Sequence, residues 1–182
     1  SVTIGALARV WGDYAVNIAA ESLMVRRNDG PRSDLARLHG ARLVTASEGE
    51  SRASLAESVV KQITGDDAIT VRRLYENEFE FRPGAKIFLA TNHEPRIRGT
   101  DEGIWRRLWL LPFTVTIPEE ARDPMILERL EAEGSGILNW CLEGLRRYQE
   151  NGCRLAPPEK VLAATARFRS ESDMVGRFLA QE

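Results

Sequence analysis

The stretch KIFLATNHEPRIRGTDEGIWRRLWLLPF, residues 86–113, joins two apolar runs through a polar turn and a pair of arginines. Its first run ends in Thr91 and Asn92 and is typical of a strand in the middle of a parallel sheet. The second run begins at Arg106 and Arg107 and predicts another strand. Ligands of open parallel sheets bind beyond the carboxyl ends of the strands. The amide and the arginines are therefore candidate site residues.

On both sides of this stretch, segments with a helical spacing of apolar residues alternate with segments that have a strand pattern. Apolar residues three and four apart predict helices, whereas alternation and short apolar runs predict strands. The predicted fold class is α/β, with a parallel sheet and a C-terminal helical segment. The expected strands and hairpin cover residues 14–18, 43–46, 68–81, 86–92 and 106–113, and the expected helices cover residues 1–12, 34–40, 54–65, 125–152 and 157–181.

The composition limits the class of protein. The chain has 182 residues, 43% of them hydrophobic, and a formal net charge of -2, so overall charge does not drive DNA binding and any such contact needs a local patch. Cys141 and Cys153 lie outside any metal-binding spacing, as expected in a reducing cytosol. His39 and His93 lack partners at metal-ligand spacing. No apolar run has membrane-spanning length, so we expect a cytoplasmic protein without membrane association.

Carboxylates follow one predicted strand, and an amide ends another. Glu48 and Glu50 come after the strand at 43–46, and Asn92 lies at the end of the strand at 86–92. If these strands are neighbours, the two kinds of group meet at one sheet edge, where they could orient a water against a phosphate held with Mg²⁺. The alternatives are solvated or helix-capping acids and a turn-forming asparagine.

The two arginines need a partner, because a charge at the edge of a core is costly unless it is paired. A phosphate is one candidate, since phosphoryl-transfer machines often use an arginine from a neighbouring subunit. The alternative is a structural ion pair of Arg106 or Arg107 with Asp101 or Glu102.

Several of these segments together resemble a known family. The blocks GDYAV, ARLVTASEGE and VKQITGDDAITVRRLYENEFEFRPGAKIFLATNHEPRIRGTDEGIWRRLWLLPF are similar to the helicase part of phage and plasmid primase-helicases, a superfamily 3 branch of the AAA+ ATPases. The resemblance covers residues 1 to about 150 and is most specific in ATNHEPRIRGTDEGIWRR. It implies a P-loop NTPase-like three-layer sandwich and a hexameric ring ATPase that translocates on single-stranded DNA with a primase domain upstream.

The resemblance also implies a division of the chain. Residues 1–117 would be a partial helicase core, and residues 118–182 a helical segment. Within that segment, FRSESDMVGRFL resembles the linker into a winged-helix region. Independently of the family, the helical spacing of Trp140, Leu142, Leu145 and Tyr148 favours a buried helix face over a base-stacking platform.

Carried over residue by residue, the resemblance gives roles to the candidate site. Glu48 matches the Walker B acid for Mg²⁺ and water activation, Glu50 could contribute, and Ser47 stands where many relatives have a first acid. Asn92 matches the sensor asparagine that positions the attacking water. Arg106 and Arg107 fall where the family has its arginine finger, with Arg107 slightly favoured.

The hairpin at 68–81 corresponds to one that projects toward the ring channel in this family. Arg72, Arg73 and Lys61 are thus candidates for contact with the DNA backbone. Solvated basic residues are the alternative for the two arginines, and support of the active-site helix is the alternative for Lys61.

A Walker A loop, which would cradle the phosphates of ATP, does not occur in these residues. By the resemblance, Ser1 would be the last residue of that loop and an Mg²⁺ ligand, and the strand before the loop would also lie upstream. We therefore expect a truncated helicase that hydrolyses little ATP by itself. The alternatives are an inactive AAA+-like DNA-binding or assembly module, which Ser47 favours, and an AAA+ regulator of protein partners.

Overall fold

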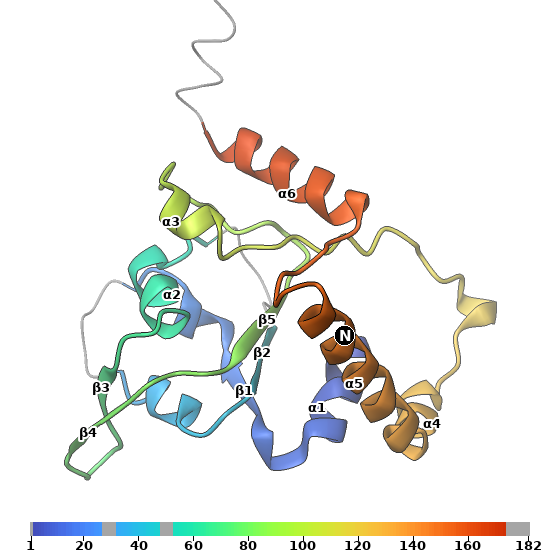
Figure 1. Cartoon of the computed structure of the whole chain (residues 1–182), viewed down its shortest axis with the longest axis horizontal. Coiled ribbons are helices and arrows are strands. Elements are labelled where there is room, and N and C mark those ends of the chain that lie inside the picture. Colours follow the sequence, from blue (N-terminus) through green and yellow to red (C-terminus); the bar gives the residue numbers. More distant parts are fainter. Residues whose placement is uncertain (1, 27–31, 48–52, 174–182) are drawn as a thin grey trace, which may run out of the picture. The chain divides into compact units, whose positions relative to one another are not determined.

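The computed structural model describes residues 2–26, 32–47 and 53–173 (Figure 1). Contacts divide the chain into two compact units, a sheet unit of residues 13–108 and 168–182 and a helical unit of residues 1–12 and 109–167. The mixed α/β class predicted from the sequence is confirmed. The predicted functional boundary between residues 117 and 118 stays a prediction.

A parallel three-stranded sheet forms the centre of the sheet unit. Its strands are β1 (Ala15–Ala19), β2 (Leu43–Ser47) and β5 (Lys86–Ala90), in the order β1-β2-β5. The first four residues of β2 are buried because a neighbouring strand lies on each side and other elements pack on the faces. The strand at 86–90, predicted to lie in the middle of the sheet, is instead at the edge of the described sheet, and four of its five residues are half-buried.

Short helices and a hairpin complete the sheet unit. The helix α2 (Glu57–Ile63) buries Val60 and Ile63, as its apolar spacing predicts. The strands β3 (Ile69–Arg72) and β4 (Glu78–Phe81) pair antiparallel and extend away from the three-stranded sheet (Figure 1), which confirms the hairpin. The other elements of this unit are η1 (Gly12–Tyr14), η2 (Ala20–Leu23), η3 (Leu35–Leu38) and α3 (Glu102–Trp105).

The strand predicted at 106–113 is wrong. Arg106 and Arg107 complete the turn of α3, and residues 108–117 form neither helix nor strand. Trp109 and Phe113 are 42% and 81% exposed. A strand needs a neighbouring strand for its backbone hydrogen bonds, and no strand of the described residues pairs with this run. The apolar composition indicates β propensity, but the described part of the chain supplies no strand to pair with.

The helical unit contains α1 (Val2–Trp11), η4 (Glu119–Ala121), α4 (Ile126–Ala132), α5 (Gly134–Glu150) and most of α6 (Glu159–Ser172). Helix α1 packs against α4 and α5, and Arg9 forms an ion pair with Glu131 of α4. Ala6 is the buried apolar residue of this unit within the described ranges. The buried face predicted on α5 is wrong, because its larger apolar side chains find no cover in this small unit; Trp140, Leu142 and Leu145 are exposed.

Within residues 2–26, 32–47 and 53–173, no helix is both long and apolar enough to cross a membrane.

Candidate functional site at the strand ends

The carboxyl ends of β2 and β5 lie side by side, which meets the condition set in the sequence analysis. Ser47, the last residue of β2, is the register partner of Ala90, the last residue of β5. The residues that follow each strand therefore begin at one edge of the sheet. Glu48 and Glu50, predicted for this edge, lie outside the described residues, as does Ser1.

Asn92 is placed at this edge by a tight turn. The Thr91 hydroxyl accepts a hydrogen bond from the His93 backbone N–H at 3.1 Å. Asn92 between them is exposed, and its amide makes no hydrogen bond with the described part of the chain. An amide with both of its polar atoms free can orient a water or a phosphate. The sensor role stays a prediction.

The chain after Asn92 forms backbone hydrogen bonds with the segment that leads into α2. The backbone N–H of Leu55 donates to the Arg96 carbonyl at 2.9 Å, and the Arg96 N–H donates to the Ala53 carbonyl at 3.0 Å. Ile97 is buried beside this pairing. These bonds fix where the loop runs between Asn92 and the arginine pair.

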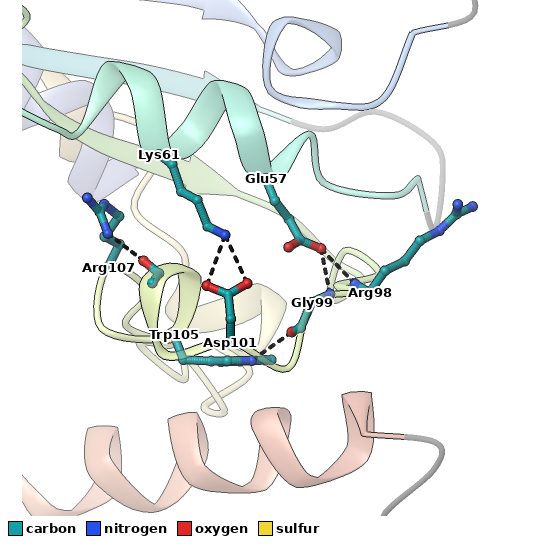
Figure 2. A network of polar contacts seen from close by, with 8 residues as sticks. Glu57, Lys61, Arg98, Gly99, Asp101, Trp105 and Arg107 are labelled. Carbon is teal, nitrogen blue, oxygen red and sulfur yellow. Dashed lines mark hydrogen bonds and ion pairs between the residues drawn. The ribbon is translucent and has the colours of Figure 1, made fainter. Parts of the chain in front are cut away.

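Side chains of α2 then hold the next part of the loop (Figure 2). Glu57 Oε1 accepts hydrogen bonds from the backbone N–H groups of Arg98 and Gly99, each at 2.8 Å, while the Arg98 guanidinium extends away. Lys61 Nζ lies 2.9 Å from both carboxylate oxygens of Asp101. Trp105 Nε1 donates to the Gly99 carbonyl at 3.0 Å. The network ties α2, the loop and α3 together.

Sequence reasoning missed most of this network. Glu57 and Lys61 are four residues apart and thus share one face of α2, which was the available signal, but their loop partners could not be read from spacing. The pairing with Asp101 matches the supporting role expected for Lys61. DNA contact by Lys61 stays a prediction.

The pair of Lys61 and Asp101 makes the stability of this loop depend on pH. The hydrogen bond from Lys61 lowers the pKa of Asp101 below its usual 3.8; desolvation opposes the shift, and the Lys61 charge and the N–H groups of Gly103 and Ile104 add to it. Because the folded-state pKa is the lower one, the stabilisation is present above pH 3.8 and is lost as the pH falls through the folded-state pKa.

We expect Asp101→Asn to lower the urea midpoint of the protein at about pH 6, and this difference from the wild type to shrink as the pH falls below 3.8. Urea unfolding of both proteins across the pH range measures it. A difference that is constant with pH would contradict the assigned ion pair.

A side chain at Gly99 would displace the Glu57 carboxylate. A Cβ built on this glycine would overlap the Glu57 carboxylate and would lie 3.0 Å from Asp101 Oδ2. The overlapping atom is Oε2, so the Glu57 carboxylate must shift, and a shift disturbs the two hydrogen bonds that its Oε1 accepts from the loop. We expect Gly99→Ala to reduce the free energy of unfolding by about 1–3 kcal/mol, measured by chemical denaturation.

Two comparisons make the Gly99 test specific. Gly136→Ala, in a helix with open space around its Cβ position, is expected to be neutral or to stabilise by up to about 1 kcal/mol. In a Glu57→Ala background, Gly99→Ala should cost less, because the overlapping carboxylate is gone. Equal costs in both backgrounds would argue against this contact.

The two candidate arginines have different surroundings. The Arg107 guanidinium donates to the Gly103 carbonyl, and its buried Nε has no partner among the described residues. Arg106 is exposed and makes no hydrogen bond or ion pair with the described residues. Asp101 pairs with Lys61, and Glu102 pairs with Arg169, so the ion pairs considered as an alternative for these arginines do not form.

The end of α6 holds α3 from the other side. Phe168 meets the buried Trp105 ring edge-on, with 5.4 Å between ring centroids, and the Arg169 guanidinium carbon lies 6.0 Å from the same ring. Trp105 also bonds to the loop, so it fixes the element that carries Arg106 and Arg107.

The hairpin exposes its basic residues, as predicted. Arg72 points outward, with Glu78 as its cross-strand partner. Arg73 lies over the Phe79 ring at 5.1 Å and 3.6 Å from a Glu76 oxygen. The acids beside these arginines offset their charge, and contact with DNA stays a prediction. No group of three metal-ligating side chains occurs within the ranges that the structure covers.

Two viral proteins are similar to this chain. One, from Acanthamoeba polyphaga mimivirus, is named "Putative helicase L207/L206" and is 29% identical over 80% of the chain and 17% of its own length. The other, from Frog virus 3 (isolate Goorha), is named "Putative helicase 022R" and is 27% identical over 100% of the chain and 20% of its own length. The chain thus spans about a fifth of the length of the curated relatives it matches.

A family match covers most of the sheet unit and more than half of the chain. It spans residues 7–107, which include β1, β2, β5, the hairpin and the network around Glu57. The chain therefore belongs to the family of unknown function DUF5906.

Proposed function

We propose that the chain is part of an ATP-driven motor that moves on single-stranded DNA, a helicase. The observation that carries the proposal is the register of β2 and β5, which starts the segments containing Glu48 and Asn92 at one sheet edge. The helicase names of the two viral relatives support the same activity.

The proposed cofactors are ATP and Mg²⁺, bound in a superfamily 3, AAA+-type site. The amide of Asn92, exposed and without a partner among the described residues, has the right chemistry to orient a water near a phosphate. Glu48, with Glu50 and Ser1, would supply oxygen ligands of the kind Mg²⁺ prefers. Bound Mg²⁺ would neutralise charge on the phosphates.

The phosphate-binding loop of this site, with its preceding strand, is proposed to lie upstream of Ser1. Such a strand would find a place beside β5, whose outer edge pairs with no strand of the described sheet and whose residues are only half-buried.

The proposed assembly is a ring, with an arginine finger reaching the nucleotide of the adjacent protomer. Arg106 suits this role because its side chain is exposed and uncommitted, whereas Arg107 is bonded to its own helix. In the ring, Arg72 and Arg73 of the hairpin would contact the DNA backbone, and a primase domain would precede the motor in the same protein.

The test is steady-state ATP hydrolysis by the full-length protein with and without single-stranded DNA. The proposal expects hydrolysis that DNA stimulates. A well-folded protein that contains a glycine-rich loop and hydrolyses no ATP would overturn it. That result would favour the second candidate, an inactive DNA-binding or assembly module, which the serine at position 47 in place of an acid supports.

A further inference from the structure

A cavity of about 490 Å³ lies within the sheet unit, apart from the strand ends. Val16, on its wall, is the second residue of β1 and thus lies toward the amino end of the sheet. Ala36 and Leu74 add to this apolar part, and the polar lining consists of Ser33, Arg37, His39 and Arg73. The volume falls in the range of small-ligand sites, roughly 300–1,000 Å³.

Among the described residues, the polar lining carries positive charge and includes no acid. Arg37 is exposed, and its guanidinium forms no hydrogen bond or ion pair with any described residue. Arg73 has Glu76 as an acidic neighbour at 3.6 Å, outside the lining. Exposed pairs of this kind contribute little, so a stronger anion can displace Glu76.

Aromatic rings contact two of these groups, His39 and Arg73. His39 meets Phe79 and Phe81 edge-on, with centroid distances of 5.5 and 5.3 Å. The Arg73 guanidinium carbon lies 5.1 Å from the Phe79 centroid. A guanidinium that lies near an aromatic ring can still donate its N–H groups to an anion. The site is therefore partly organised before any ligand binds.

We propose that this cavity binds a phosphate group of single-stranded nucleic acid, with Arg37 and Arg73 as donors. Planar guanidinium groups match the oxygens of phosphate, and Ser33 adds a hydroxyl donor. Beside the cavity, Tyr75 in the hairpin loop is 98% exposed and can stack on a base. The choice of ligand rests on the proposed function, whereas the cavity and its charge do not.

The test is binding of a fluorescent oligo-dT to the full-length protein, followed by anisotropy at several salt concentrations. We expect Arg37→Ala to weaken binding about tenfold and to reduce the slope of log K against log salt by about 0.7, the value for one phosphate contact on a single strand. Arg82→Ala is the matched control, because Arg82 is also exposed and unpaired among the described residues but lies outside the cavity. It should bind nearly as the wild type does.

The outcomes separate this proposal from the proposed function. If the wild type shows DNA-stimulated ATP hydrolysis but Arg37→Ala and Arg82→Ala have equal affinities and salt slopes, the cavity proposal fails and the motor stands. A different result would identify the ligand as a mononucleotide and make the nucleic-acid assignment wrong. In that case dTMP would compete with the same affinity as oligo-dT, and Arg37→Ala would weaken the binding of dTMP but not the binding of oligo-dT. Circular dichroism of each variant confirms folding.

Discussion

Asn92→Ala in the full-length protein is expected to lower kcat for ATP hydrolysis by about 100-fold or more, the usual cost of losing one positioned polar group at a reacting centre. The amide lies in the turn directly after β5, beside the end of β2, and no described residue uses it for a structural bond. Its loss should therefore leave the free energy of unfolding nearly unchanged. Steady-state hydrolysis and chemical denaturation measure the two effects.

Asn139→Ala is a suitable control for this prediction. Asn139 is exposed on α5, in the other compact unit, and should tolerate alanine without loss of hydrolysis. If Asn92→Ala hydrolyses ATP at the wild-type rate, Asn92 is a turn residue and the sensor role is wrong.

Alanine substitutions of the two arginines are expected to have different effects in the same assays. Arg106→Ala should reduce ATP hydrolysis by about 1,000-fold, the lower end of the range for arginine fingers, with little change in stability because its side chain is exposed and unbonded among the described residues. Arg107→Ala should mainly lower the melting temperature, because it removes the hydrogen bond to Gly103.

Arg106→Lys sharpens this prediction. Lysine keeps the charge but loses the planar fork of donors, so only partial activity should return. The reverse pattern, with Arg107→Ala inactive but stable and Arg106→Ala active, would restore the slight preference for Arg107 that the family resemblance gives.

Local signals in the sequence were enough to predict much of the secondary structure of the sheet unit. The apolar run of β2 and the alternation in β3 and β4 reflect burial on two faces and on one face, so each could be read directly. The expectation that Glu48 and Asn92 meet at one sheet edge depended on which strands are neighbours. The periodicity of a sequence does not reveal strand order. The register of β2 with β5 supplied that order.

Features that depend on distant partners could not be predicted. Phe113 and Trp140 have the composition of a strand and of a buried helix face, yet both are exposed because nothing in the described chain covers them. The contacts of Glu57 with the loop at 98–99 join residues about forty positions apart and rely on backbone N–H groups, which every sequence has. The different surroundings of Arg106 and Arg107 also emerged only from the fold.

The most direct test of the motor account is to mix the Asn92→Ala and Arg106→Ala proteins, each inactive alone, and to measure DNA-stimulated ATP hydrolysis. If the site forms between subunits, about a quarter of the interfaces in a random mixture combine an intact Asn92 with an intact Arg106 from the neighbour. The account predicts that activity returns on mixing. Activity that stays at the level of the separate variants, in a mixture shown to exchange subunits, would contradict a shared active site.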